Sequence, residues 1–234
     1  MMNISDDIKY VGCDDSTLDL FEGQYKLNYG VTYNSYVILD EKIAIMDTVD
    51  KRTTDEWISN LENVLGDKIP DYLVVQHLEP DHSGSMQVLA QKYPGMDIVR
   101  SERAAAMVPQ FVNMDLSKRI ISVKEGDTLT LGNHTLTFIM APMVHWPEVM
   151  MTYDAVSKTL FSADGFGTFG DSRNRISWIV EARRYYFNII GKYGTSVQNV
   201  LKKAENLDIK NIAPLHGPVL GKDVSEYIEY YKKW

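Results

Sequence analysis

The sequence feature that most constrains this chain is an apolar run, residues 72–75, that ends in a cluster of ionisable side chains. Residues 76–84 hold four such groups: His77, Glu79, Asp81 and His82. Ionised carboxylates and imidazoles are costly to bury unless a partner neutralises them, and a metal ion is the strongest such partner. The alternative is a polar loop that caps the next helix, because aspartate and serine are good capping residues. That alternative leaves both histidines and the glutamate without a role.

Composition limits the classes of protein to which the chain can belong. It has 234 residues, 44% apolar and 24% charged, which predicts one soluble globular domain over residues 1–234. The net charge of −8 argues against a nucleic-acid or anionic-membrane surface. No apolar run reaches the roughly 18 residues of a membrane span, and residues 1–7 lack the pattern of a signal peptide. Cys13 is the only cysteine, so thiolate metal clusters are excluded and a cytoplasmic location is expected.

Strand and helix patterns are interspersed along the chain. Alternating or continuous apolar runs predict strands at residues 36–39, 43–46, 72–75, 98–99, 119–123, 128–131, 135–140, 150–153, 159–162 and 211–215. Helical periodicity predicts helices at residues 53–65, 86–93, 104–112, 176–190, 196–204 and 224–234. Hairpins dominate the middle of this order, so two sheets face to face with helices outside fit better than a doubly wound parallel sheet.

Further histidine and aspartate side chains follow predicted strands. His145, Asp164 and His216 each come shortly after an apolar strand, where loops on a rigid sheet can converge. Taken singly, each histidine could equally be an ordinary hydrogen-bonded one, and Asp164 could belong to a simple turn. Together with the first cluster they make seven candidate ligands, which suits two adjacent metals that share a bridging carboxylate better than one tetrahedral zinc. His134 falls in a turn and is expected to be solvated.

These residues resemble a known family. The run His-x-Glu-x-Asp-His at residues 77–82, followed by His145, Asp164 and His216, is similar to the metallo-β-lactamase-like diiron domain of the flavodiiron proteins, over essentially the whole chain. The resemblance implies an α+β fold, an αββα sandwich with two irons (Fe²⁺/Fe³⁺) and a bridging oxo, hydroxo or peroxo ligand. It assigns His77, Glu79 and His145 to one iron and Asp81, His82 and His216 to the other, with Asp164 as the bridge.

The donor set favours iron over zinc. Hydrolases of the wider superfamily resemble His-x-His-x-Asp-His, and Glu79 replaces the middle histidine here. A third carboxylate stabilises the higher oxidation state of a redox metal, and imidazole with carboxylate suits non-haem iron. Around the site, Trp146 is expected to shield the metals and Glu148 to orient a ligand imidazole. Tyr193 is a weaker candidate to place a hydroxyl near bound oxygen, since it also reads as an ordinary tyrosine of an amphipathic helix.

The resemblance also implies which cofactors, partners and ligands to expect. Flavodiiron proteins carry a flavodoxin-like domain whose FMN feeds electrons to the irons of the partner subunit. Nothing in this sequence resembles the phosphate-cradling loop of that domain, so we expect no FMN within residues 1–234 and a homodimer only by analogy. The sequence leaves open whether the natural ligand is dioxygen or nitric oxide.

Three functional hypotheses follow. The favoured one is a protein that binds dioxygen as a sensor or carrier in an anaerobe, resembling the stand-alone oxygen-binding diiron proteins of chemotaxis signalling, with a signalling protein as partner. The second is the catalytic core of an oxygen or nitric oxide reductase, an oxidoreductase served by an external electron donor such as a flavoprotein or rubredoxin. The third is a dinuclear zinc hydrolase, in which metal-bound hydroxide attacks the substrate.

Overall fold

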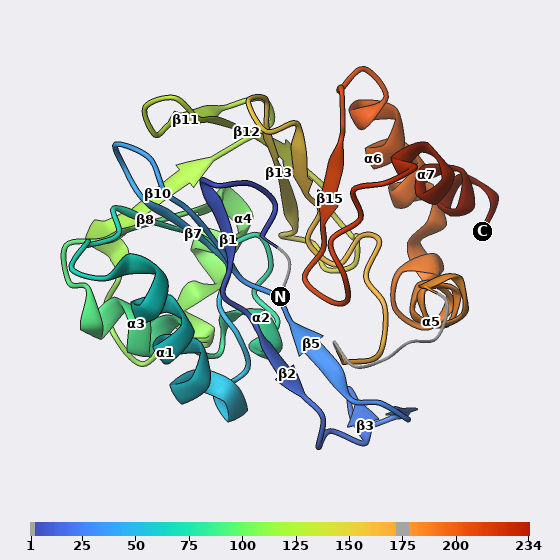
Figure 1. The fold of residues 1–234 in the computed structure, drawn as a ribbon, viewed down its shortest axis with the longest axis horizontal. Helices are drawn as coiled ribbons and strands as arrows, with labels where there is room; N and C mark the ends of the chain where they lie inside the picture. The colour runs from blue at the N-terminus through green and yellow to red at the C-terminus, as the bar shows by residue number, and fades with distance from the viewer. Residues whose placement is uncertain (1–2, 172–177) are drawn as a thin grey trace.

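Two main β-sheets lie face to face, with helices on their outer sides (Figure 1). The computed structural model describes residues 3–171 and 178–234. The first sheet has the order β1 (Ile8–Tyr10), β6 (Tyr36–Ile38), β7 (Ala44–Met46), β8 (Tyr72–Val74), β9 (Asp97–Ser101), β10 (Ile120–Val123). The second has the order β11 (Thr128–Thr130), β12 (Thr135–Met140), β13 (Met150–Asp154), β14 (Thr159–Phe161), β15 (Asn211–Ala213). The predicted pair of sheets is therefore confirmed.

The strand directions bring several carboxyl ends to one edge. In the first sheet β7, β8, β9 and β10 run parallel to one another, and β7 is antiparallel to β6. In the second sheet β12 and β14 both run antiparallel to β13, and β15 runs parallel to β14. Strands β12, β14 and β15 therefore end on the same side of their sheet. The loops after β8, β12, β14 and β15 are the ones that carry the predicted ligands.

Side chains alternate between the two faces of each strand, as the pleat requires. On β8 and β9, Val74 and Val99 point between the sheets, where they pack with Phe138 and Phe161 of the second sheet. Leu73 and Ile98 point outward and join the core beneath the helices. Both faces of the central strands are thus buried, which explains their continuous apolar runs.

Helices cover each sheet from outside (Figure 1). The first sheet is covered by α1 (Thr54–Leu65), α3 (Met86–Lys92) and α4 (Glu102–Met107), and the second by α6 (Gly194–Ala204) and α7 (Val224–Lys233). Helix α5 (Trp178–Tyr185) packs against α7 through Trp178 and Tyr227. Shorter turns are η1 (Lys51–Thr53), α2 (Pro80–Ser83), η2 (Val108–Gln110), η3 (Ser117–Arg119), the π-helix η4 (Tyr186–Ile190) and η5 (Gly191–Tyr193). The predicted helix at residues 176–190 begins outside the described residues. Its remainder is α5 followed by the π-helical turn.

Helix α1 shows how the sequence sets an element's ends. Trp57, Leu61 and Leu65 recur at a spacing of four and are all buried against the core. Gly66 follows at φ 58°, a left-handed conformation that glycine adopts without steric cost, and its N–H donates to Glu62 O over 2.9 Å. The predicted helix over residues 53–65 is confirmed to within one residue.

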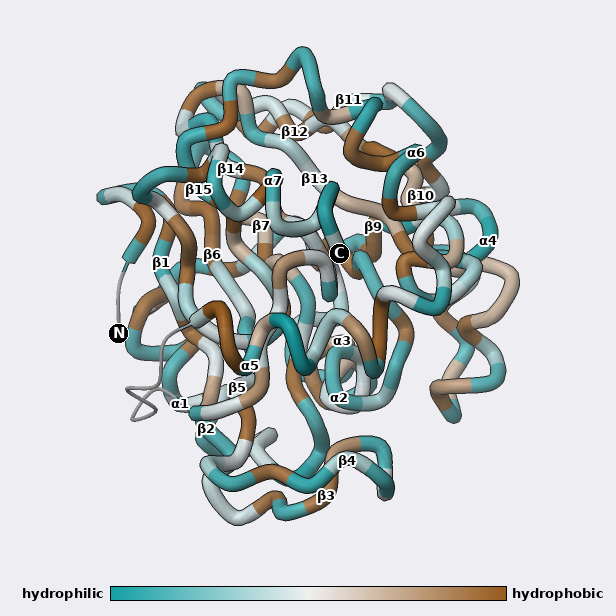
Figure 2. The backbone as a smooth tube through the Cα atoms, turned by 90° about the vertical axis from the view of Figure 1, so that its right-hand side faces the viewer, coloured by the Kyte–Doolittle hydropathy of each residue, from teal (hydrophilic) through white to brown (hydrophobic). Residues whose placement is uncertain are grey.

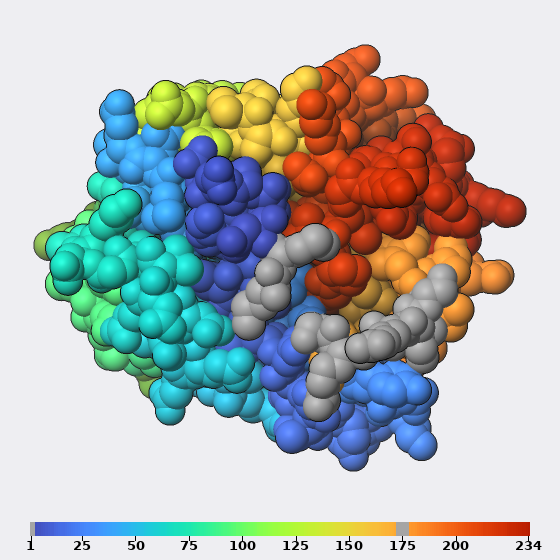
Figure 3. Space-filling view, viewed as in Figure 1, coloured from blue at the N-terminus to red at the C-terminus, as the bar shows by residue number. Residues whose placement is uncertain are grey.

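The first 33 residues add small strands that the sequence patterns do not predict. Strand β2 (Cys13–Asp15) pairs with β5 (Val31–Tyr33), and β3 (Leu20–Phe21) pairs with β4 (Tyr25–Lys26). The β3–β4 hairpin projects at one end of the molecule (Figure 2). In the space-filling view, dark blue N-terminal residues lie between the cyan and green part of the chain and its yellow and red part (Figure 3).

His134 is buried rather than solvated, so that expectation was wrong. Its ring Nδ1 lies 2.9 Å from Asp154 Oδ2 and its backbone N–H donates to Asp40 Oδ2 over 2.6 Å. Asp154 is the last residue of β13 and Asp40 lies between β6 and β7, and a local turn pattern cannot reveal either contact. Among the described helices, none has the length and apolar content needed to cross a membrane.

Candidate metal centre

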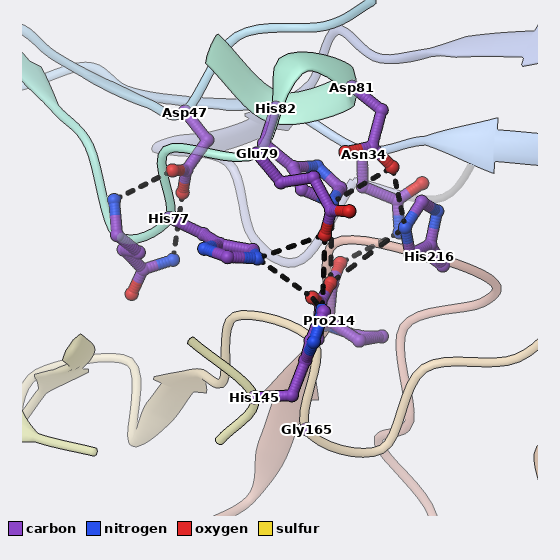
Figure 4. A network of polar contacts seen from close by, with 12 residues as sticks. Asn34, Asp47, His77, Glu79, Asp81, His82, His145, Gly165, Pro214 and His216 are labelled. Carbon is purple, nitrogen blue, oxygen red and sulfur yellow. Dashed lines mark hydrogen bonds and ion pairs between the residues drawn. The ribbon is translucent and has the colours of Figure 1, made fainter. Parts of the chain in front are cut away.

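All seven predicted ligands meet at one edge of the paired sheets. Figure 4 labels all of them except Asp164. They come from four loops, after β8, β12, β14 and β15. Their donor atoms form two neighbouring groups, each with its atoms within 4.8 Å of one another: His77, Glu79, His145 and Asp164 in the first, Asp81, His82 and His216 in the second. These are the groupings that the family resemblance implied.

The first group is built around two imidazoles and two carboxylates. Glu79 Oε2 lies 3.2 Å from His77 Nε2 and 3.1 Å from His145 Nε2. Asp164 Oδ2 lies 3.3 Å from His77 Nε2 and 3.0 Å from His145 Nε2. Spacings of about 3 Å are those expected between ligand atoms that each stand about 2 Å from a shared ion.

The second group faces the other oxygen of the same aspartate. Asp164 Oδ1 lies 3.3 Å from His82 Nε2 and 3.8 Å from His216 Nε2. Asp81 Oδ2 completes the group, at 3.3 Å from His82 Nε2 and 3.2 Å from His216 Nε2. One carboxylate therefore presents one oxygen to each group, which is the geometry of a bridge between two ions.

Several of these buried atoms have no hydrogen-bond partner among the described residues, and this tests whether a metal fits. The atoms are Asp81 Oδ1 and Oδ2, His82 Nδ1 and Nε2, Asp164 Oδ1 and Oδ2, and His216 Nε2. A buried polar atom without a partner costs about 1–3 kcal/mol or more. Metal coordination would satisfy most of them at once, so the residues present fit a pair of cations.

The loop that carries four of the ligands is fixed by its own hydrogen bonds. Thr48 Oγ1 and Thr48 N both donate to His82 O, over 2.7 and 2.9 Å. Ser83 Oγ donates to Leu78 O over 2.6 Å. A Cβ at Gly84 would come within 2.4 Å of Pro80 O, so glycine is required for the chain to turn this tightly. The ligands are therefore held in place before any ion binds.

Outer hydrogen bonds set which ring nitrogen of two histidines faces the centre. His77 Nδ1 lies 2.8 Å from Glu148 Oε1, and His216 Nδ1 donates to Thr32 O over 2.6 Å. A carbonyl or carboxylate oxygen accepts a hydrogen bond, so Nδ1 carries the proton and Nε2 is left to bind. The expected role of Glu148 is matched by this contact.

Gly217, at φ 84°, allows the chain to pass Thr168, since a Cβ there would lie 2.0 Å from Thr168 Cγ2.

Attraction between imidazoles and carboxylates decides the direction in which the pKa values of His145 and Asp164 shift. Burial opposes protonation of His145, but Asp164 and Glu79 outweigh it and raise its pKa to about 9. Burial likewise opposes ionisation of Asp164, and the neighbouring His82 and His145 nevertheless hold its pKa well below the ordinary value. Without a metal, the His145 imidazole therefore carries a proton where a cation would bind. Metal uptake must release that proton.

Comparison with known proteins agrees with the fold and the site. Residues 31–217 match the family model described as ODP family beta lactamase. The nitric oxide reductase of Moorella thermoacetica is 35% identical over 242 residues, which cover 99% of this chain and 60% of the relative. The chain belongs to the ODP family of metallo-β-lactamase-like flavodiiron cores. The predicted family and fold are confirmed.

Solved structures of flavodiiron proteins superpose closely on this chain. The flavodiiron protein of Giardia intestinalis has a TM-score of 0.91 at 29% identity, over 97% of this chain and 57% of its own. Rubredoxin oxygen:oxidoreductase of Desulfovibrio gigas has a TM-score of 0.91 at 32% identity, over 99% and 61%. The chain thus spans roughly three fifths of each of these relatives.

Aromatic rings enclose the flavodiiron site. Trp146 makes edge contacts with the rings of His77 and His145, with centroids 5.2 and 6.3 Å apart, as expected for a shielding residue. On the other side, Phe21 of the β3–β4 hairpin lies edge-on to His216 at 5.2 Å. These rings keep bulk water away from the ligand atoms.

The tyrosine that faces the centre is Tyr185. Its ring lies 5.6 Å from that of His216, and within the described part of the chain its buried hydroxyl has no hydrogen-bond partner. Burial and the carboxylates of Asp164, Asp81 and Glu79 hold its pKa well above the ordinary value, so the hydroxyl stays protonated and able to donate. Tyr193, the sequence candidate, is half-buried at the start of α6, and its ring contacts Lys192.

Proposed function

We propose that this chain holds a carboxylate-bridged pair of iron ions that reacts with dioxygen or nitric oxide. The observation that carries the proposal is the position of Asp164, with Oδ2 toward His77 and His145 and Oδ1 toward His82 and His216. A carboxylate shared in this way suits two ions held close enough for one small ligand to meet both.

The choice of iron rests on the ligand types. The two groups contain four imidazoles and three carboxylates. Three anionic oxygens favour a metal that gains charge on oxidation, and the set lacks the thiolates that softer metals prefer. Bound ferrous ions would supply electrons to a diatomic ligand, and the protein would supply the enclosure and the hydrogen-bond donors.

The protein's own residues have definite tasks in this proposal. Glu148 and the Thr32 carbonyl orient two imidazoles, and Trp146 and Phe21 exclude water. The Tyr185 hydroxyl is the donor available to a ligand that lies between the two groups. Because it has no other partner, its hydrogen bond would be given to that ligand alone.

We favour the reductase core over the oxygen carrier. Relatives of this chain are named nitric oxide reductase and rubredoxin oxygen:oxidoreductase. Two ferrous ions hold two electrons, and reduction of dioxygen to water needs four, so turnover would require an electron donor outside residues 1–234. The oxygen carrier or sensor is the second candidate, because residues 77–216 supply all seven ligands by themselves.

A stopped-flow experiment separates the two candidates. Iron-loaded protein is reduced without oxygen and mixed with dioxygen or nitric oxide, with and without reduced rubredoxin and its reductase. A reductase core gives repeated consumption of the gas with the donor, whereas a carrier gives a stable absorption band that vacuum reverses. Failure of the reduced diiron protein to react with either gas would refute the proposal as a whole.

A further inference from the structure

An apolar cavity lies between α6, α7 and the second sheet. Its volume is about 330 Å³. Its wall is formed mainly by apolar side chains, among them Met151, Leu160, Val197, Val200, Ile212 and Ile228. Carboxylates and one lysine lie at its outer part: Glu205, Asp208, Glu229 and Lys232. Apolar side chains of this kind provide contacts for apolar guests such as xenon or benzene.

The inner end of the cavity touches the two loops that carry first-group ligands. Val144, which immediately precedes His145, lines it, and so does Gly165, which immediately follows Asp164. A Cβ at Gly165 would lie 3.0 Å from Met151 Cε, so the absent side chain keeps this wall thin. The cavity therefore reaches residues that directly adjoin His145 and Asp164 of the first group.

The metal centre needs a route for its gaseous ligand. The side chains of His77, His82 and His216 have no exposed surface, and aromatic rings cover them. The side chains of Glu79 and Asp81 are 14% and 12% exposed, so a gas molecule can arrive from that side or through the packed apolar protein. Apolar diatomic gases are more soluble in apolar surroundings than in water, so a cavity beside the centre would concentrate them.

We propose that this cavity is a docking site for dioxygen on its way to the metal centre, an inference that rests on the proposed function. The acidic rim argues against a fatty acid as the occupant. Glu205, Asp208 and Glu229 would repel its carboxylate, and Lys232 is the cation in the lining. Lys232 is moreover paired with Glu229 over 2.9 Å. An uncharged diatomic molecule is neither attracted nor repelled by these side chains.

The test uses xenon as the probe and the iron-loaded protein. Ala204→Phe and Val200→Phe each place a ring in the cavity, from half-buried and buried positions of α6. Lys202→Phe puts the same ring on an exposed position of the same helix and is the matched control. Xenon binding is measured by ¹²⁹Xe NMR and by a xenon-pressurised crystal, and the rate of reaction with dioxygen by stopped flow.

We expect wild type and Lys202→Phe to bind xenon in the cavity and to react with dioxygen at equal rates. Both filling variants should lose the xenon site and react several-fold more slowly, with unchanged iron content and thermal unfolding midpoint. Absence of xenon from the wild-type cavity, or an unchanged rate in two folded filling variants, would overturn the inference. If wild type reacts with neither dioxygen nor nitric oxide, the proposed function fails, and this outcome is read from the gas reaction alone, whatever the xenon result.

Discussion

Glu148 offers the sharpest test of how this protein prepares its metal ligands. Its buried carboxylate lies 2.8 Å from His77 Nδ1 and accepts from Leu78 N over 3.0 Å. Glu148→Gln keeps an oxygen that can accept both hydrogen bonds and removes only the negative charge. Glu148→Ala removes both acceptors and leaves two buried donors unpaired.

The expected effects are graded. Loss of such an outer partner costs about 10–100-fold in metal affinity, so we expect about tenfold for the glutamine and about a hundredfold for the alanine. These correspond to roughly 1.4 and 2.8 kcal/mol. The loss should fall on the ion bound by His77, Glu79 and His145, because Glu148 contacts His77.

Competition with a graded series of iron chelators measures the two affinities separately. Glu102→Gln, at an exposed position in the first turn of α4, removes the same charge away from the site and should leave both affinities unchanged. If Glu148→Ala folds and binds both irons as tightly as wild type, the orienting role of Glu148 is refuted.

Three further predictions follow from particular contacts. Asp164→Ala should abolish magnetic coupling between the irons and lower the iron content, and a normal content with intact coupling would contradict the bridge. Tyr185→Phe should keep both irons and weaken the binding of the oxygen ligand by about 1 kcal/mol, roughly fivefold in affinity. The affinity is read from the oxygen-dependent absorption band, and an unchanged affinity would show that the hydroxyl does not contact the ligand. Burial raises the pKa of Asp47 to about 6, so its contribution to stability is full below a pH of about 4 and is lost as the pH rises through 6. Asp47→Asn should therefore stabilise metal-free protein more at neutral than at acidic pH, by up to ~3 kcal/mol in chemical unfolding, and a difference independent of pH would contradict this.

Much of the site could be predicted because its determinants are local in sequence. Each ligand loop directly follows an apolar strand, and parallel strands deliver their carboxyl ends to one edge. The grouping of His77 with His145 through Asp164 came instead from the family resemblance. Residue patterns alone left His145 and His216 open to an ordinary structural role.

The contributions that sequence reasoning missed are long-range or irregular. Phe21 lies in a strand of two residues, too short for any periodic signal, yet it reaches His216 across the fold. Tyr185 and Tyr193 are separated by a π-helical turn and a 3₁₀ turn. Because these turns change the angle between successive side chains, helical spacing could not indicate which tyrosine faces the centre.

The central claim is that two iron ions share Asp164. Mössbauer and parallel EPR spectra of the iron-loaded, oxidised protein test it most directly. The account predicts two irons per chain, with an antiferromagnetically coupled diferric pair that is EPR-silent. One iron per chain, or the EPR signal of isolated ferric ions at full loading, would contradict it.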